Sequence, residues 1–414
     1  MTREKSTSPL WTRDFTIITI GSIISMMGST ISGFALGLLI LDYTGSTFLY
    51  AMFMFLFTFP SIVMPLIAGP YLDKFSRKKT IYTLDFISSA LYAFVAASLI
   101  FGFFNFALIA IGAFLIGTIN SVYRVAYNSF YPLLITEGNY QKAYSISTIL
   151  EVLTACVVPL SKFLYDLVGL APLLIADAVS YLIAAIMETQ IKHEEKYSED
   201  RKDEAYGIKK YGSDFKEGLN YLITEKGLLF ITIHFIIISI LSGFTSVLVL
   251  PFFKNNYSNG EYLYIIVGGC AMLGRLIGGS IYYKIKIPTH KKFIIAVIAY
   301  IISALSEGFI LFLPFRIMAI LYFFSGLLSV TSYNIRISST QGYVPHEKKG
   351  RFNGTFEMLT ASGALIGEVL AGSLSIILSE RILIMIFGLL TALSAIVFIA
   401  GNKKHIAPIY NRET

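Results

Sequence analysis

Long apolar stretches separated by short polar breaks run along almost the whole chain. A helix needs roughly 20 apolar residues to cross the hydrocarbon core of a bilayer, which is about 30 Å thick. Stretches of this kind are predicted at residues 14–41, 47–72, 80–103, 105–134, 142–167, 171–190, 227–253, 261–284, 292–312, 315–341, 351–378 and 381–401. Lipid offers backbone groups no hydrogen-bonding partner, and the alternation of barrel strands is absent, so every stretch is predicted to be an α-helix.

The composition agrees with this pattern. Hydrophobic residues make up 55% of the 414 positions and charged residues 14%, which leaves too little polar surface to cover a soluble protein of this size. The first stretch is too long for a signal peptide and lacks a convincing cleavage site, so it is expected to remain as a membrane helix. The predicted fold is all-α, with twelve transmembrane helices in two pseudo-symmetric six-helix bundles.

One long charged segment interrupts the apolar pattern. It defines an N-terminal bundle over 1–190, a cytoplasmic linker over 191–226, a C-terminal bundle over 227–402 and a cytoplasmic tail over 403–414. Inside the linker, Phe215, Leu219, Tyr221 and Leu222 alternate with polar residues. This spacing predicts a short amphipathic helix at the membrane interface.

Basic residues cluster in loops that would share one side of the membrane. They are Lys74, Arg77, Lys78 and Lys79, then Lys284, Lys286, Lys291 and Lys292, then Lys348, Lys349 and Arg351, and finally Lys403 and Lys404. Such loops face the cytoplasm, so both termini and the linker are predicted to be cytoplasmic in a multi-pass protein of the cell membrane. Contact with anionic lipid accounts for the net charge of +7, and no nucleic-acid partner is expected.

A basic hinge lies between the second and third apolar stretches. It reads Gly69-x-x-x-Asp73-Lys74-x-x-Arg77-Lys78, and part of it recurs in the second half as Gly279-x-x-x-Tyr283-Lys284. The hinge resembles the loop between the second and third helices of the major facilitator superfamily. Two bundles from one ancestral unit would place a substrate site at their interface, near the bilayer midplane.

Further motifs narrow the resemblance. The best single match is Gln341-x-x-Val344-Pro345-x-Glu347-x-x-Gly350-Arg351. Others are Ser25-Met26-Met27-Gly28, Thr44-Gly45-Ser46, Pro60, Pro65, Asp85, Asn128, Pro132-Leu133-Leu134, and Asp177-Ala178 with Ser180. From 14 to 400 the chain resembles the drug- and macrolide-efflux branch of proton antiporters, which also includes siderophore exporters. This resemblance implies export of amphipathic small molecules in exchange for protons by alternating access.

The hinge is predicted to form a conformational gate. Asp73 would face the positive N-terminus of the eleventh helix, beside Gly350 and Arg351, where an anion is favoured by about 0.3–1 kcal/mol. Gly69 would permit close helix approach. The remaining hinge cations, Lys74, Arg77 and Lys78, would add pairing. The alternative is that these charges only set the topology.

Charged residues inside the apolar stretches are candidates for ion coupling, since each costs about 2.5–3.5 kcal/mol at the bilayer centre. Arg124 and Glu151 lie at similar depth and predict an ion pair that protonation of Glu151 would break; a permanent strut is the alternative. Glu357 and Glu368 share one helix face and would be successive proton or cation stations. Glu307 and Arg275 are further buried charges.

Polar and aromatic residues in the same stretches are candidates for a substrate cavity. Asn120, Asn334, Arg336 and His234 would line it, although such residues also make helix-to-helix hydrogen bonds. Tyr123, Tyr127 and Tyr131 form an aromatic stripe suited either to a cavity or to packing. Aromatic side chains would accept aromatic or cationic molecules by stacking and cation–π contact.

Some features depart from the family pattern. Ile116 stands where many proton-driven exporters carry an arginine, and the fifth stretch offers only Pro159 in place of Gly-x-Gly-Pro. Tyr283 replaces the acid of the hinge, so a latch is expected in one half only. Proton coupling therefore rests on the resemblance and on the buried carboxylates.

Several other functions stay open or are disfavoured. The alternatives are a dedicated exporter or importer of one metabolite, such as a siderophore or a lipid-like compound, and a transporter-like receptor or lipid-modifying enzyme. No ATP-binding loop, catalytic residue or cofactor motif stands out, and the cysteines Cys156 and Cys270 lie in apolar stretches, which disfavours a disulfide or metal site. The expected partners of the monomer are a small-molecule substrate, protons or else sodium ions, and membrane lipids.

Overall fold

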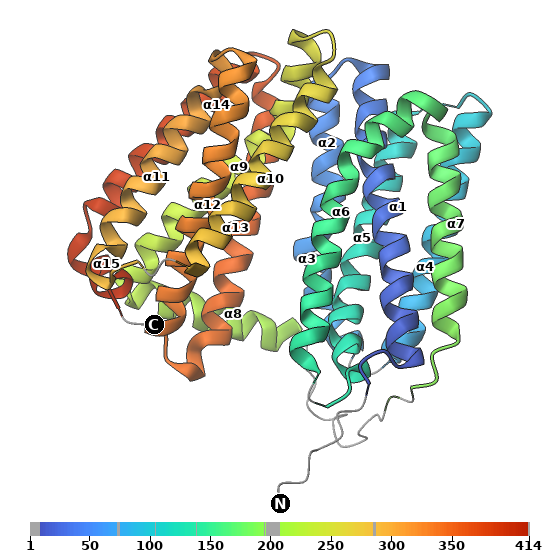
Figure 1. The fold of residues 1–414 in the computed structure, drawn as a ribbon, viewed down its shortest axis with the longest axis horizontal. Helices are drawn as coiled ribbons and strands as arrows, with labels where there is room; N and C mark the ends of the chain where they lie inside the picture. The colour runs from blue at the N-terminus through green and yellow to red at the C-terminus, as the bar shows by residue number, and fades with distance from the viewer. Residues whose placement is uncertain are drawn as a thin grey trace, which may run out of the picture. The chain divides into compact units, whose positions relative to one another are not determined.

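The computed structural model describes residues 9–72, 75–103, 105–137, 139–193, 195, 208–284 and 287–412. Within these ranges the secondary structure is helical, and no strand occurs (Figure 1). Contacts divide the chain into two compact units. Unit 1 comprises Met1–Gly45 and Leu56–Ile208, and unit 2 comprises Ser46–Phe55 and Lys209–Thr414.

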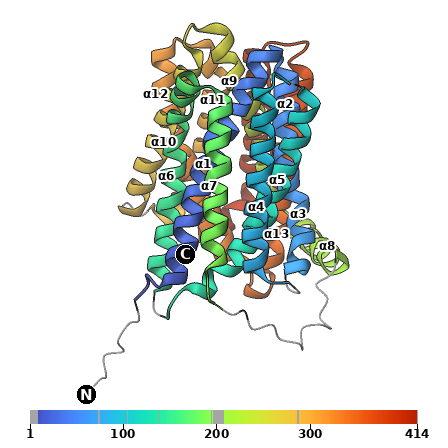
Figure 2. The same ribbon diagram turned by 90° about the vertical axis from the view of Figure 1, so that its right-hand side faces the viewer.

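Unit 1 is a bundle of long helices. They are α1 (Arg13–Thr44), α3 (Pro60–Leu72), α4 (Arg77–Ile100), α5 (Phe106–Phe130) with the 3-10 turn η1 (Tyr131–Leu134), α6 (Tyr140–Val168) and α7 (Leu170–Thr189). Helix α4 packs along α7 and also against α5 (Figure 2). Helix α1 packs against both α7 and α6. Helix α7 therefore packs against both α1 and α4.

Unit 2 contains the remaining helices. They are α8 (Ile208–Thr224), α9 (Lys226–Asn256), α10 (Gly260–Lys284), α11 (Lys292–Phe309), α12 (Phe315–Tyr343), α13 (His346–Leu374), α14 (Glu380–Ser394) and α15 (Lys403–Tyr410), with the short elements η3 (Thr289–Lys291), η4 (Ile310–Phe312) and η5 (Ala395–Ala400). Helix α10 packs along α12, α9 along α13, and α11 along α14. The helix α2 (Thr47–Thr58) begins in unit 2 and ends in unit 1.

Local sequence explains where several helices begin. The side chains of Thr12, Ser76 and Asn105 accept hydrogen bonds from backbone N–H groups in the first turns of α1, α4 and α5, which satisfies donors that the helix leaves free. The predicted span 47–72 is two helices, because α3 begins at Pro60. Proline suits a first helical position but has no N–H to continue the preceding helix.

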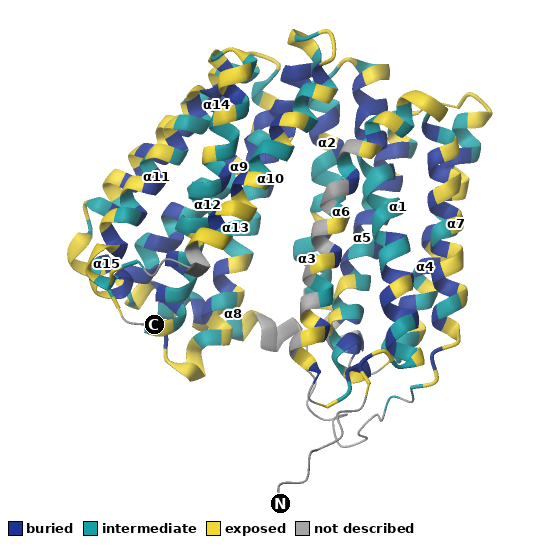
Figure 3. Ribbon diagram, viewed as in Figure 1, coloured by how far each residue is buried: buried dark blue, intermediate teal, exposed yellow. Residues whose placement is uncertain are grey.

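The burial pattern suits a lipid environment. Among the described helices, ten are long and apolar enough to cross a membrane: Arg13–Thr44, Thr47–Pro65, Arg77–Ile100, Phe106–Leu134, Leu170–Thr189, Lys226–Asn256, Gly260–Ile281, Thr289–Phe312, Phe315–Tyr343 and Glu380–Ala400. Many large apolar residues along them are exposed. Figure 3 colours exposed residues of the ribbon yellow. The predicted all-α membrane fold is confirmed in this form, and the number of twelve helices stays a prediction.

The two amphipathic segments, α8 and α15, both contribute buried side chains to the core of unit 2. Helix α8 occupies the linker where the sequence predicts an amphipathic helix. The predicted tail contains α15, in which Ile406, Ile409 and Tyr410 are buried in the core of unit 2. The Tyr410 Oη lies 3.0 Å from Tyr300 Oη, and Ser339 Oγ donates to the Tyr410 carbonyl oxygen at 3.3 Å. Helix α15 is thus part of the core of unit 2.

Candidate functional site

Two carboxyl groups meet in the interior of unit 1. Asp85 on α4 and Glu188 on α7 are both 0% exposed, and their carboxyl groups lie in hydrogen-bonding range of each other. The contact follows from the packing of α4 along α7. Tyr123 Oη on α5 donates to Glu188 Oε1 at 3.5 Å and lies 3.3 Å from Ser22 Oγ on α1. Four helices therefore contribute to one polar cluster.

A third buried carboxyl group, that of Asp177, lies nearer the N-terminus of α7. Asp177 is 1% exposed, Ser180 Oγ donates to its Oδ1 at 3.1 Å, and the Ser32 hydroxyl lies close by. Gly28 of α1 faces this carboxyl group so closely that a Cβ atom there would overlap Asp177 Oδ1. The glycine is therefore what lets α1 approach the acidic residue. The structure thus joins two motifs, around Gly28 and Asp177, that the sequence presents far apart.

Hydroxyl groups occupy the space between the two acidic positions of α7. Ser29 Oγ lies 2.5 Å from Tyr181 Oη, and the Tyr181 ring stacks on Tyr92 with centroids 5.6 Å apart. Glu188 and Asp177 are about three helical turns apart and lie on one face of α7. The α1–α7 contact is therefore polar over much of its length, although both helices belong to apolar spans.

None of these acidic residues is among the coupling residues predicted from the sequence. Asp85 and Asp177 were noted only as motif matches, and the criterion that selected Glu151, an acid inside an apolar span, applies equally to both. Glu188 lies at the very end of its span and so resembles an ordinary loop charge. Only the packing of α4 against α7 reveals that it is buried.

The other candidates of unit 1 are only partly brought together. Tyr127 stacks between Tyr123 and Tyr131, with ring centroids 6.1 and 5.2 Å apart. The three tyrosine rings of the predicted stripe therefore pack against one another. Asn120 is half-buried and Arg124 is exposed. The side chain of Glu151 lies outside the described residues, so its pairing with Arg124 stays a prediction.

Candidate charges of unit 2 form two groups. Glu307 on α11 is half-buried beside the Thr245 hydroxyl and within electrostatic range of Arg275, whose side chain on α10 is exposed. Glu368 on α13 is 7% exposed, and no donor among the described residues reaches its Oε2. Tyr50 of α2 lies nearby within the same unit. The second acid on α13, Glu357, is exposed.

Arg336 of α12 is a buried cation surrounded by aromatic rings. It is 8% exposed, and its guanidinium carbon lies 4.5 Å from the ring centroid of Phe356, 5.1 Å from that of Tyr333 and 5.2 Å from that of Phe235. No carboxylate of the described chain forms an ion pair with it. Cation–π attraction therefore replaces the usual acidic partner.

The remaining polar candidates of unit 2 differ in exposure. His234 is 0% exposed, and its Nδ1 lies 2.7 Å from Ser394 Oγ. Its ring also contacts Tyr300 edge to face, with centroids 4.8 Å apart. Asn334 is half-buried. His234 thus makes a helix-to-helix hydrogen bond, one of the two roles expected for such a residue.

The structure describes the hinge residues before Asp73 and after Lys74, but not these two residues. Gly69 belongs to α3, whereas Asp73 and Lys74 lie outside the described residues. Arg77 and Lys78 begin α4, and their backbone N–H groups donate to the Glu195 carboxylate at 3.1 and 2.9 Å. Lys78 Nζ donates to the carbonyl oxygen of Ile191. The residues that follow α7 thereby cap the start of α4.

Of the two remaining gate residues, Arg351 contacts the linker helix. Arg351 forms ion pairs with Asp214 at 3.3 Å and Glu217 at 3.0 Å, both on α8. Lys348 Nζ lies 4.5 Å from the ring centroid of Tyr221. Burial and then the charge of Glu225 raise the pKa of the Tyr221 phenol above its usual value. Gly350 itself is exposed.

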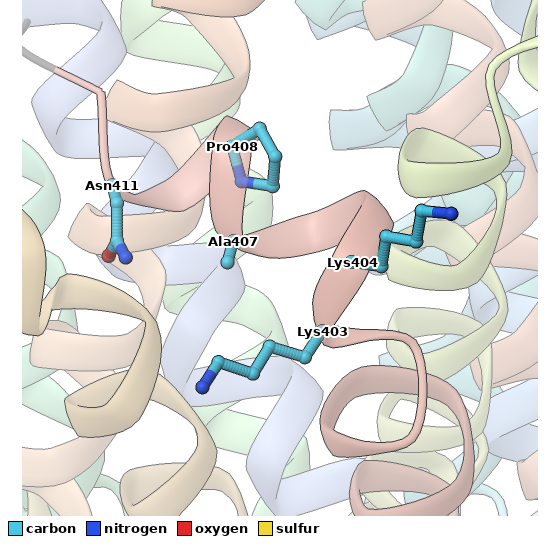
Figure 4. Close-up of a pocket in the computed structure, with 5 residues that line it drawn as sticks. All are labelled: Lys403, Lys404, Ala407, Pro408 and Asn411. Carbon is cyan, nitrogen blue, oxygen red and sulfur yellow. The ribbon is translucent and has the colours of Figure 1, made fainter.

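A surface pocket lies beside α15. Lys403, Lys404, Ala407, Pro408 and Asn411 line it. In Figure 4 the two lysine side chains extend in opposite directions, so their charges do not converge on one point. This pocket therefore lacks the arrangement that would hold an anion.

Known proteins resemble the chain in sequence and fold. Residues 18–367 match the family model of the Major Facilitator Superfamily. Over 287 residues the chain is 24% identical to YkuC of Bacillus subtilis (strain 168), described as an uncharacterized MFS-type transporter. That match spans 66% of this chain and 66% of YkuC, slightly less than two thirds of its length.

Two solved structures show the same arrangement of helices. The nucleoside transporter NupG superposes with a TM-score of 0.66 at 14% identity, over 94% of this chain and 99% of that one. The peptide transporter POT in complex with sulfate superposes with a TM-score of 0.68 at 10% identity, over 98% of both chains. At these identities the likeness shows the fold alone.

Proposed function

Because the chain belongs to the major facilitator superfamily, a superfamily of multi-pass membrane transporters, we propose that it exports amphipathic, drug-like small molecules in exchange for protons. It is a transporter and not an enzyme. In this proposal twelve helices form two six-helix bundles in the cell membrane, with both termini in the cytoplasm. The bundles alternate in opening a central cavity to either side.

The observation that carries the proton part of the proposal is the burial of a carboxyl group in each unit. Glu368 in unit 2 and Asp177 in unit 1 each have an oxygen that no described donor reaches. An ionised carboxylate is costly at membrane depth, and protonation removes that cost. Each group is therefore suited to bind and release a proton. We propose Glu307 and Glu368 as coupling residues on this argument. We propose Glu151 and Glu357 as further coupling residues because they lie inside apolar spans of the sequence.

The proposed substrate contacts are polar and aromatic. Arg336 with its three rings, together with Asn334, Arg275 and His234, would contribute from unit 2. Asn120, Tyr123, Arg124 and Tyr127 would contribute from unit 1. Aromatic faces accept aromatic and cationic molecules without a strict shape requirement, which supports a broad substrate range.

The proposed gate is the basic hinge and the start of α13. Arg351 forms ion pairs with Asp214 and Glu217 on α8. These contacts support a role for this end of α13 as a site where ion pairs rearrange. Gly69, Asp73, Lys74, Arg77, Lys78 and Gly350 complete the proposed gate. We expect the protein to act as a monomer in contact with anionic lipids.

A second candidate is transport of one dedicated metabolite. The fold neighbours are a nucleoside and a peptide transporter, so these two classes join siderophores and lipid-like compounds as candidates. Either direction of transport is compatible with this second candidate.

Transport by purified protein in liposomes tests the proposal. Fluorescent dyes, macrolides, siderophores, nucleosides and dipeptides are each offered under an imposed pH gradient, with protein-free liposomes and a protonophore as controls. We expect dyes or macrolides to accumulate on the acidic side and to stop when the protonophore is added. Accumulation of only one metabolite class would favour the second candidate, and no gradient-driven movement of any compound would contradict both.

A further inference from the structure

We propose that Asp85 and Glu188 form a carboxyl pair that binds one shared proton inside unit 1. The proton adds to one carboxylate oxygen, and the resulting O–H group donates to the other carboxylate. Release returns the same proton to water and leaves two negative charges. That this proton is one of those exchanged during transport rests on the proposed function.

The two carboxyl groups are buried, and most of their oxygens have no donor among the described residues. Both side chains are 0% exposed. No donor of the described chain reaches Asp85 Oδ1, Asp85 Oδ2 or Glu188 Oε2, although the two carboxyl groups lie in hydrogen-bonding range of each other. Two ionised carboxylates in hydrogen-bonding range of each other repel strongly in a water-excluded interior. A single proton between them supplies the missing donor and removes one charge.

The groups around the pair on α5, α7 and α4 are hydroxyls, one distant acid and cations at the start of α4. Helix α5 contributes Tyr123, whose hydroxyl donates to Glu188 Oε1, and α1 contributes the Ser22 hydroxyl. On α7 the nearest further acid is Asp177, about three turns away. On α4 the nearest cations are Arg77, Lys78 and Lys79, about two turns from Asp85 along the helix. Lys79 is exposed, and the backbone N–H groups of Arg77 and Lys78 bind Glu195.

The other helices add no compensating cation either. On α5, Arg124 is exposed, and on α6, Lys142 is exposed, while nothing is described for the side chain of Glu151. At the start of α1, Asp14 accepts from the backbone N–H of Lys192. Asp85 and Glu188 form no ion pair with a described lysine, arginine or histidine. The pair therefore has no fixed positive charge to hold both groups ionised.

The surroundings of the pair suit a proton and not a metal ion. In the part of the chain that the structure describes, no group of three or more His, Cys, Asp or Glu residues could hold a metal. A Cβ on Gly21 would lie only 3.3 Å from Glu188 Oε1, so α1 leaves little room beside the pair. A proton needs no such room.

The position of the pair links its protonation to helix packing. Asp85 and Glu188 join α4 to α7, and Tyr123 and Ser22 bring in α5 and α1. Loss of the proton would place two like charges across the α4–α7 contact and weaken it. Protonation of the pair would therefore favour the close-packed arrangement of these four helices.

Infrared difference spectroscopy on the purified full-length protein tests the proposal. A protonated carboxyl group gives a C=O stretching band that ionised carboxylates lack and that moves to lower frequency in D2O. We expect such a band at neutral pH and its loss at alkaline pH. Asp85→Asn and Glu188→Gln should each remove the same component, because the new amide donates to the remaining carboxylate in place of the proton.

The double variant provides the sharpest comparison. A single shared proton predicts that Asp85→Asn with Glu188→Gln removes no more of the band than either change alone. The control Asp166→Asn, a half-exposed acid paired with Lys162, should leave the band unchanged. Twice the loss in the double variant, or no loss in either single variant, would overturn the shared proton. So would loss of the band on adding sodium ions at constant pH.

The test stays decisive if an amide variant fails to fold, and it is independent of transport. If an amide variant does not fold, Tyr123→Phe carries the test: it removes a donor to ionised Glu188, so the band should persist to higher pH, and an unchanged midpoint would overturn the proposal. The spectra need no substrate. A missing band therefore refutes the pair alone, whereas absent transport in liposomes refutes the proposed function alone.

Discussion

At the scale of single residues, two residues of the same type have different roles when their neighbours differ. Gly28 and Gly33 both belong to α1, yet Gly28 faces the Asp177 carboxyl group and Gly33 has open space around it. Arg336 is buried without a carboxylate, whereas Arg351 is exposed with two. Residue type and depth therefore do not settle a role until the neighbours are known.

Gly28→Ala should destabilise unit 1. The added methyl group would overlap Asp177 Oδ1, and overpacking of this kind costs about 1–3 kcal/mol. Gly33→Ala is the matched control on the same helix, since a Cβ there meets nothing within 4 Å and alanine favours a helix by up to about 1 kcal/mol. Denaturant unfolding in micelles measures both, and equal effects would contradict the close α1–α7 contact.

Arg336→Ala should destabilise unit 2 by about 2 kcal/mol, because a desolvated cation–π contact contributes that much or more. Arg381 provides the control, since it lies 5.0 Å from the single ring of Phe252 at a more exposed position. Arg381→Ala should cost about 0.5–1 kcal/mol. The same unfolding assay compares them, and a smaller loss for Arg336→Ala would show that the three rings do not stabilise its charge.

At the scale of helices, apolar length predicts most of the fold. The predicted spans agree with the long helices to within a few residues, because only a helix satisfies its backbone in lipid. The split at Pro60 and the packing of α15 were missed. Helix α15 is eight residues long and begins with two lysines, so no span criterion could find it. The linker helix α8 was found because its apolar residues repeat at helical spacing.

The candidate site was harder to predict than the fold. Asp85 and Glu188 lie on different helices, and no sequence pattern states that α4 packs on α7. The superfamily was recognised from its hinge, and the family match confirms it. The drug-efflux branch stays a prediction, since the motifs that suggest it are short and the fold neighbours carry other substrates in their names.

Charge reversal at Arg351 should release α8 from α13. Arg351→Glu would turn two attractive contacts, with Asp214 and Glu217, into repulsive ones. Exposed ion pairs contribute only about 0–1 kcal/mol, so the expected effect is faster amide hydrogen exchange in α8 without loss of the fold. Amides of α15 serve as the internal control. Adding Glu217→Arg should restore slow exchange, and a failure to do so would contradict pairing at this contact.

At the scale of the whole molecule, the account requires that proton movement and substrate movement are linked. A coupling residue should be needed for accumulation but not for exchange of substrate between two equal pools. Glu368→Gln should therefore abolish accumulation driven by a pH gradient and keep most of the exchange rate. Glu357→Gln, at an exposed position on the same helix, shows whether one or both acids couple. Loss of both activities in Glu368→Gln would indicate a structural role.

The most direct measurement records both fluxes at once in the same liposomes. A pH-sensitive dye in the lumen reports protons while a labelled dye or macrolide reports the substrate, with no pH gradient imposed at the start. The account predicts that substrate moving down its own gradient drives protons in the opposite direction, and that a protonophore abolishes the pH change. Substrate movement with no proton movement, or with protons moving in the same direction, would contradict it.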